Sequence, residues 1–196
     1  MSSITENFDS YNNGRLYGQG NWVDGGGAHP ELIVVYSGKA KWFDSTHTDG
    51  SANGAAKLPF TGLKSGSISF KYYCSSTSGR TGIQIKDGST IVCFIDTGET
   101  GAGKVRLGGA TNVDFGTYSA NTWYLIELEF DVSTQKVRAR FNSGTWSSWI
   151  NAANSFTKVD GFFLYADDSR SITTYWDDIS ITGVEANVFI PQIIFV

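Results

Sequence analysis

The segment from Trp123 to Val132 has the periodicity of a β-strand. Ile126, Leu128, Phe130 and Val132 fall on one parity, and Leu125, Glu127, Glu129 and Asp131 fall on the other. Because successive side chains of a strand point to opposite faces, this pattern predicts a long strand with one buried and one largely charged face. No stretch of the chain shows helical periodicity over more than two turns. The segment must therefore be buried against other strands.

Further strands are predicted along the whole chain. Ile68, Phe70, Tyr72 and Cys74 alternate with Ser67, Ser69, Lys71 and Tyr73, and hairpins are expected around the turns Ser37-Gly38 and Asp87-Gly88. The other expected strands include Lys104–Leu107, Lys136–Phe141, Trp146–Trp149, Gly161–Ala166 and Thr174–Thr182, and the longest loop is expected over Asp44–Lys57. With 23 Gly, 13 Phe, 9 Tyr, 6 Trp and 3 Pro, the composition favours an all-β sandwich or barrel.

Length and charge exclude several classes of protein. At 196 residues the chain is long enough for one domain with its own core. The net charge of −4 argues against nucleic-acid binding, which needs basic patches. Met1–Glu6 has neither the basic nor the apolar region of a secretory signal, and no apolar run is long enough for a membrane span.

Cys74 and Cys93 are predicted to be buried free thiols. Both lie in apolar strand patterns, and in a three-stranded meander they would occupy second-neighbour strands about 9–10 Å apart. That separation exceeds the limit of about 7 Å between the Cα atoms of a disulfide. Two free thiols suit folding in a reducing cytosol.

Three segments resemble one family of jelly-roll domains. They are Phe8-Asp9-Ser10-Tyr11 with Gly14, Leu16, Gly18-Gln19 and Trp22, then Thr122-Trp123-Tyr124 through Asp131 to Val137, and finally Trp176-Asp177-Asp178-Ile179-Ser180-Ile181. These segments are similar to bacterial and phage domains of the concanavalin A-like lectin/glucanase (laminin G-like) superfamily. We therefore expect an all-β jelly-roll β-sandwich of two antiparallel sheets over residues 1–183, followed by an extended apolar C-terminal arm over residues 184–196.

The resemblance raises the question of glycoside hydrolysis. Laminarinase-type glycosidases of this superfamily carry Glu-x-Asp-x-Glu on one strand, whereas Glu127, Glu129 and Asp131 form Glu-Leu-Glu-Phe-Asp, with the acids permuted. Retaining hydrolysis needs carboxyl groups about 5–5.5 Å apart, which only acids two residues apart on a strand approach. Arg138 and Arg140 on the next strand offer a simpler role for the acids, as ion pairs on a solvent face. No catalytic residue is therefore assigned.

Carboxylates near both ends of the domain are candidates for a metal site. The resemblance implies a structural calcium between acids of the first and last strands, where this chain has Glu6, Asp9, Asp177 and Asp178. Calcium takes six to eight oxygen ligands, so four acids meeting at one sheet edge would supply part of its shell. The alternative is that Asp177 and Asp178 cap loops or pair with Lys and Arg.

Aromatic side chains near polar loops are candidates for a glycan site. A flat ring covers the apolar face of a sugar, and flanking Asn, Asp and Ser supply hydrogen bonds. The candidates are Tyr17, Trp22, Trp42, Trp146 and Trp149. Burial in the core is the competing interpretation for each of them.

The segment Gly98–Lys104 matches the Gly-x4-Gly-Lys part of a phosphate-binding loop. That motif needs a following Ser or Thr and a helix, but Val105 and a predicted strand follow here. We expect a hairpin loop.

The C-terminal segment Val188–Val196 is uncharged and mostly apolar. Pro191 and the adjacent pair Ile193-Ile194 break strand alternation, so both faces of the segment need cover. We expect it to bind a neighbouring subunit through Val188, Phe189, Ile190, Ile193, Ile194 and Phe195. The alternative is an arm packed on its own domain.

Two functions fit these features. The first is a non-catalytic structural protein of a virion or surface filament, of the phage decoration or tail-associated type, which self-assembles through its C-terminal arm. The second is a lectin-like carbohydrate-binding or adhesion module that uses loop aromatics. A glycosidase or lyase of the same superfamily comes third.

Overall fold

The computed structural model describes residues 1–27, 29, 31, 33–43, 53–78, 80–98, 103–167 and 172–186. These residues form fifteen strands: β1 (Ser2–Glu6), β2 (Gly14–Arg15), β3 (Val23–Gly26), β4 (Ile33–Val35), β5 (Ala40–Phe43), β6 (Asn53–Cys74), β7 (Thr81–Asp87), β8 (Thr90–Thr97), β9 (Lys104–Gly108), β10 (Asn112–Thr117), β11 (Thr122–Asp131), β12 (Lys136–Phe141), β13 (Ile150–Asn151), β14 (Val159–Asp167) and β15 (Thr173–Glu185). Across these ranges, no helix has the length and apolar character that crossing a membrane requires.

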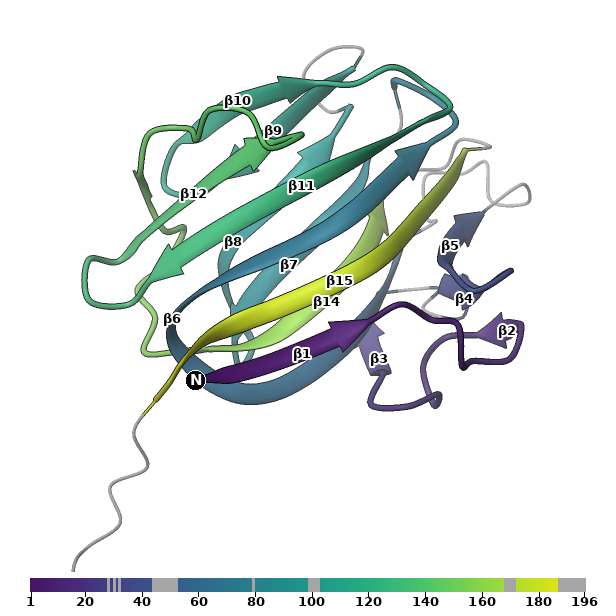
Figure 1. Cartoon of the computed structure of the whole chain (residues 1–196), viewed down its shortest axis with the longest axis horizontal. Helices are drawn as coiled ribbons and strands as arrows, with labels where there is room; N and C mark the ends of the chain where they lie inside the picture. The colour runs from purple at the N-terminus through teal and green to yellow at the C-terminus, as the bar shows by residue number, and fades with distance from the viewer. Residues whose placement is uncertain are drawn as a thin grey trace, which may run out of the picture.

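Strand β6 takes part in both layers of a sandwich. Its first half pairs with β14 and β3, and its second half pairs with β11 and β15. One layer therefore runs β10-β9-β8-β7-β14-β6-β3. The other runs β13-β12-β11-β6-β15, where β1 and β5 both pair with β15, and β4 and β2 follow β5. In Figure 1, β11, β6, β15 and β1 lie in front of β8, β7 and β14. The predicted all-β jelly-roll sandwich is confirmed.

The core lies between the two layers, where the predicted parities place it. Ile68, Phe70, Tyr72 and Cys74 of β6 and Ile126, Leu128 and Phe130 of β11 are all buried. Phe70 meets Phe162 of the opposite layer edge to face, with ring centroids 6.0 Å apart. Burial of one such side chain stabilises the fold by about 1.5–3 kcal/mol.

A buried hydroxyl cluster also joins the layers. The Tyr72 hydroxyl oxygen lies 2.8 Å from Thr81 Oγ1 and 2.6 Å from Thr97 Oγ1, and Thr81 Oγ1 lies 3.1 Å from Thr174 Oγ1. Thr81 and Thr97 belong to one layer, and Tyr72 and Thr174 to the other. All four residues are fully or almost fully buried, so their hydroxyls find hydrogen-bond partners within the core, in one another and in groups such as Thr81 O and Cys74 Sγ. Burial raises the pKa of Tyr72.

The hairpin predicted at Ser37-Gly38 is confirmed and projects from the edge of the layer that contains β15. Tyr36 and Lys39 exchange backbone hydrogen bonds of 2.9 and 3.3 Å. Ser37 and Gly38 both have positive φ values, 51° and 69°, as a two-residue turn of type I′ requires. The turn fixes Tyr36 and Lys39 beside each other.

The hairpin predicted for the glycine-rich segment after β8 is also confirmed where the structure describes it. Gly98 N donates to Lys104 O over 3.1 Å, and Thr97 pairs with Val105 as β8 turns into β9. A strand follows where a phosphate-binding loop needs a helix. Residues 99–102 lie outside the described part.

Two predicted elements differ from the structure. The loop expected over Asp44–Lys57 gives way to β6 at Asn53, because pairing with β14 and β3 overrides the low strand propensity of its Gly, Ala and Pro residues. The strand expected at Trp146–Trp149 is wrong. That segment instead runs beside β12, where Ser147 N donates to Ala139 O over 2.8 Å.

Cys74 and Cys93 are free and buried, as predicted, although their strands do not form the three-stranded meander that was considered. Cys74 ends β6 beside β11 and β15, whereas Cys93 lies on β8 in the opposite layer. Burial raises the pKa of the Cys93 thiol, which makes it an inert core group.

The predicted C-terminal arm, Val188–Val196, lies outside the described residues. Strand β15 continues to Glu185, two residues beyond the expected end of the sandwich at residue 183. Assembly through the arm stays a prediction.

Candidate functional site

Three aromatic side chains lie side by side on the outer face of the layer that contains β11, β6 and β15. The strand registers pair both Trp123 and Tyr175 with Tyr73. Ring centroids are 5.5 Å apart for Tyr73 and Trp123, 5.6 Å for Tyr73 and Tyr175, and 6.2 Å for Trp123 and Tyr175. Because Tyr72 and Trp176 are buried, strand alternation turns Tyr73 and Tyr175 away from the core.

The β4–β5 hairpin completes this group as a pocket. Tyr36, Ser37 and Lys39 face Tyr73, Trp123 and Tyr175 across a hollow of about 240 Å³. Tyr36 is 49% exposed and Trp123 is 39% exposed. We call these four aromatic residues, Tyr36, Tyr73, Trp123 and Tyr175, the aromatic cluster. It offers flat ring surface to solvent within a concave site.

Cations and hydrogen-bonding groups surround the aromatic cluster. Lys41 Nζ lies 4.5 Å from the ring centroid of Tyr36 and 5.7 Å from that of Tyr175. Lys39 Nζ lies 3.6 Å from Asp177 Oδ2. Burial raises the pKa of both Asp177 and Tyr175. The site therefore combines apolar ring faces with a polar rim.

The hydroxyl of Tyr73 is held in place by a residue beside the cluster. It donates to Asn121 Oδ1 over 2.9 Å. Asn121 precedes β11 and has a positive φ of 60°. The hydrogen bond therefore connects the turn before β11 to the ring of Tyr73.

Glu127 and Glu129 on the same face are engaged by arginines of β12. Arg140 binds Glu127 through two hydrogen bonds of 2.7 and 2.6 Å, and Arg138 binds Glu129 at 2.6 Å. The third acid, Asp131, accepts hydrogen bonds from Ser133, and these lower its pKa. Glu127 and Glu129 are therefore engaged in ion pairs, and Asp131 is engaged by the turn that follows β11.

The same arginines stack on the two tryptophans of Trp146–Trp149. The Arg138 guanidinium lies 4.7 Å from the Trp146 ring centroid and 4.6 Å from that of Trp149, and Arg140 lies 4.6 Å from Trp146. Cation–π contact adds about 0.5–1 kcal/mol at an exposed site. Trp146 and Trp149 thus belong to a group of cation–π and ion-paired side chains, and guanidinium groups already cover part of each ring.

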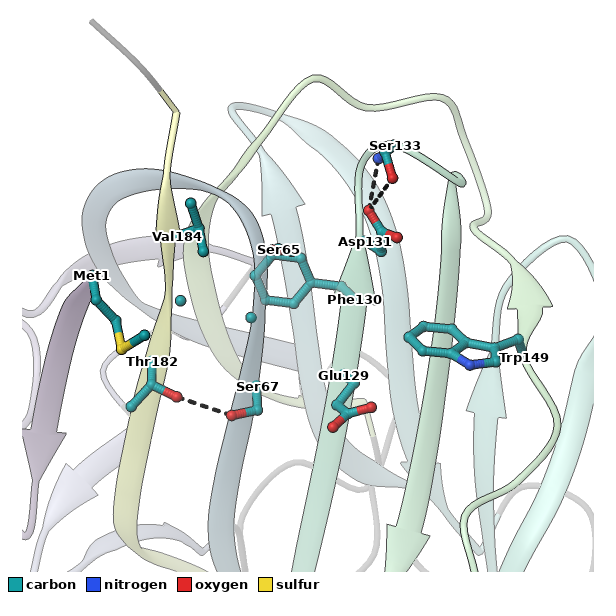
Figure 2. A pocket seen from close by; sticks show the side chains of 12 residues that line it. Met1, Ser65, Ser67, Glu129, Phe130, Asp131, Ser133, Trp149, Thr182 and Val184 are labelled. Atoms are coloured by element: carbon teal, nitrogen blue, oxygen red, sulfur yellow. Dashed lines mark hydrogen bonds between the residues drawn. The ribbon is translucent and has the colours of Figure 1, made fainter.

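An open groove of about 560 Å³ lies at the other end of this face (Figure 2). Thr182, Ser67 and Glu129 reach it from the neighbouring strands β15, β6 and β11, and Trp149 borders it. Ser67 and Thr182 share a hydrogen bond of 2.9 Å. Trp149 is 38% exposed. The described lining of the groove has one exposed aromatic ring, whereas that of the pocket of the aromatic cluster has two, Tyr36 and Trp123.

Two of the predicted ligand residues lie in the core, which corrects that prediction. Trp22 and Trp42 are 1% and 0% exposed, because the loop before β3 and strand β5 fold them beneath the sheet edge. Trp22 Nε1 donates to Glu6 over 3.1 Å. Tyr17 is half-buried under Arg15, whose guanidinium lies 4.3 Å from its ring centroid, and it is not part of the aromatic cluster.

The acids of the predicted calcium site are engaged separately. Glu6 accepts hydrogen bonds from Phe8 N, Tyr11 and Trp22, of 2.8, 2.6 and 3.1 Å. The other acids bind elsewhere: Asp9 accepts from Asn7, Asp177 pairs with Lys39, and Asp178 pairs with Lys71 at 2.6 Å.

Pairing of β1 with β15 does bring Glu6 and Asp178 to one shallow hollow of about 330 Å³. Among the described residues, no group of three His, Cys, Asp or Glu is close enough to hold a metal ion. Calcium binding stays a prediction.

Sequence reasoning missed the aromatic cluster. Alternation in the sequence puts Tyr73 on the outer face of its strand and Trp123 on the same parity as Glu127, so the pattern holds a signal for two members of the cluster. What was missing was the register of three strands distant in sequence, which sets Tyr73 between Trp123 and Tyr175.

No protein-family model and no curated protein sequence matches the chain. Solved structures do. A sialidase superposes with a TM-score of 0.71 and 11% identity, over 92% of this chain and 18% of the sialidase chain. Lectin UEA-II complexed with galactose superposes with a TM-score of 0.60 and 12% identity, over 91% of this chain and 98% of the lectin chain. A Bacillus licheniformis β-glucanase superposes with a TM-score of 0.62 and 13% identity, over 93% of this chain and 98% of the glucanase chain.

These likenesses identify the fold. The chain has the concanavalin A-like jelly-roll fold, as the sequence resemblance implied. At identities of 11–13% the similarity defines the architecture of the chain and not its activity.

Proposed function

We propose that the protein is a non-catalytic carbohydrate-binding module whose binding site is the aromatic cluster. The observation that carries the proposal is the pocket between Tyr36, Tyr73, Trp123 and Tyr175, where two rings remain well exposed beside Lys39 and Ser37. Sugars have an apolar ring face edged by hydroxyls, so they suit a flat aromatic surface with a polar rim.

The size of the pocket supports a small unit of recognition. A hollow of about 240 Å³ is below the range of about 300–1,000 Å³ that is usual for enclosed ligand sites. We expect one sugar residue to enter it and the rest of a glycan to extend into solvent. A sugar at an end or a branch of a glycan fits this geometry better than a sugar in the middle of a glycan chain.

The state of the acidic residues supports binding rather than hydrolysis. A general acid needs a raised pKa and a nucleophile needs access to the sugar. Glu127 and Glu129 are instead bound by Arg140 and Arg138, and the pKa of Asp131 is lowered. Burial raises the pKa of Asp177 beside the aromatic cluster, but Asp177 pairs with Lys39, and the described lining of the pocket includes neither Asp177 nor the second carboxylate that hydrolysis needs.

The solved structures also favour carbohydrate recognition over the virion or filament role. One of them is a lectin complexed with galactose, and others are named as a sialidase and a β-glucanase. The assembly hypothesis rests on Val188–Val196, which the structure does not describe. We therefore carry forward carbohydrate binding as the function.

A glycan array tests the proposal. The purified protein should bind a defined subset of immobilised glycans, and Trp123→Ala and Tyr175→Ala should each remove that binding. Tyr17→Ala is the control, because Tyr17 is a partly exposed tyrosine that does not line the pocket. An array with no binding above background, or binding that both cluster variants retain, contradicts the proposal.

A further inference from the structure

Two lysines converge on one phenylalanine on the outer face of the opposite layer. Phe163 of β14 lies between β6, which carries Lys57, and β7, which carries Lys86. Lys86 Nζ lies 4.0 Å and Lys57 Nζ 5.5 Å from the ring centroid of Phe163. Phe163 is 5% exposed, because neighbouring side chains cover its ring.

The local backbone makes room for this arrangement. A Cβ at Gly161 would lie 2.9 Å from Phe163 Cε2 and 3.3 Å from Lys57 Cε. Gly161 also pairs with Lys86 across the β14–β7 ladder. Any larger residue at this position would push the Phe163 ring and the Lys57 side chain away from their observed places.

The two ammonium groups lie against the same ring and repel each other, and no carboxylate in the described part of the chain pairs with Lys57 or Lys86. Burial lowers the pKa of Lys86, and the neighbouring charge of Lys57 lowers it further. Contact with the Phe163 ring offsets only part of this cost. An anion between the two ammonium groups would remove the repulsion.

Lys86 also borders a pocket with further hydrogen-bond donors. The pocket has a volume of about 310 Å³, and Arg80, Gln84 and Tyr165 line it together with the glycine backbone at Gly25–Gly27. Arg80 lies 3.6 Å from the fully buried Asp96, so its charge is engaged in an ion pair, and Lys86 supplies the second cation of the described lining. Asp24, next to Gly25, accepts from Gly26 N over 2.7 Å, and Asp87, next to Lys86, accepts from Thr157 N over 2.8 Å.

We propose that Lys57 and Lys86, over Phe163 and beside this pocket, bind a phosphate or sulfate group, either as the free ion or as an ester. Such a group presents several acceptor oxygens around one centre of negative charge, which matches two ammonium groups and the adjacent donors. This site lies on a different layer from the aromatic cluster, and it does not depend on carbohydrate binding there.

The experiment is an NMR titration of the lysine Cε–Hε signals of the full chain with sodium phosphate and sodium sulfate. Sodium chloride at equal ionic strength measures the general salt effect. We expect saturable shifts of the Lys57 and Lys86 signals with phosphate and sulfate. Lys86→Gln and Lys57→Gln should each weaken binding about tenfold or more, since each removes a charged partner.

The matched control is Lys136→Gln, which removes an exposed lysine on β12 in the other layer and should leave the affinity within about twofold of wild type. Thermal melts of each variant establish that it is folded. Shifts that chloride reproduces at equal ionic strength overturn the proposal. So does a loss of affinity in Lys136→Gln as large as that in Lys86→Gln.

A second arm distinguishes the two sources of the group. Glucose 6-phosphate is compared with inorganic phosphate, and glucose serves as the blank. Tighter binding of the ester indicates that the adjacent pocket takes part of the attached molecule, whereas equal affinities indicate that the free ion is sufficient. Either result supports an oxyanion site, and failure of both phosphates to bind contradicts it. Trp123→Ala should leave these titrations unchanged, which separates this site from the aromatic cluster.

Discussion

Replacing Trp123 with alanine removes the largest exposed ring of the aromatic cluster. Trp123 is 39% exposed, which is about 100 Å² of a side chain of about 250 Å². A sugar that covers half of this area buries about 50 Å², which at about 25 cal/mol per Å² contributes about 1.3 kcal/mol. Ring stacking adds about 0.5–1.5 kcal/mol. We therefore predict that glycan affinity falls about 20-fold to 100-fold.

Isothermal titration with the glycan selected on the array measures this loss. Trp149→Ala is the matched control, because Trp149 is the same residue type and is 38% exposed on the same outer face, at the other groove. The glycan affinity of the Trp149→Ala variant should stay within about twofold of that of the wild-type protein. If Trp149→Ala loses glycan affinity and Trp123→Ala does not, the reasoning is refuted and binding is assigned to the groove of Figure 2.

Three further predictions concern stability. Tyr72→Phe removes the hydroxyl that joins the layers through Thr81 and Thr97, and should cost about 1–3 kcal/mol, or about 2–12 °C in Tm, in a thermal melt. A loss under about 1 °C would contradict the role of the cluster. Burial raises the pKa of Tyr72, Tyr118 and Cys93, so their contribution is complete below the unfolded values of about 8.5–10 and is lost as pH rises above them. Tm should therefore fall from about pH 9 upwards, and a flat profile to pH 11 would be contrary evidence. The predicted calcium site requires that added calcium raises Tm and a chelator lowers it, and an unchanged Tm would remove that site.

Local patterns were sufficient for the strands that are buried on one face. The second half of β6 and the part of β11 from Ile126 to Asp131 alternate cleanly, and the core residues Phe70 and Leu128 follow from that alternation alone. The Ser37-Gly38 turn is likewise local, because its two positive φ values need small residues at adjacent positions.

Tertiary pairing explains what the sequence did not reveal. The first half of β6 has the composition of a loop and becomes a strand because β14 and β3 flank it. Trp22 and Trp42 stand near polar loops in sequence, yet both are buried. The aromatic cluster combines Tyr73, Trp123 and Tyr175 from strands 50 or more residues apart, and only the sheet register brings them together.

The central claim is that a glycan binds on Trp123 in the aromatic cluster. The six tryptophan indole N–H signals test it most directly, when they are followed by NMR as the glycan selected on the array is added. The Trp123 signal should shift in a saturable way, while those of buried Trp22, Trp42 and Trp176 stay in place. A bound glycan that leaves the Trp123 signal unchanged would contradict the claim.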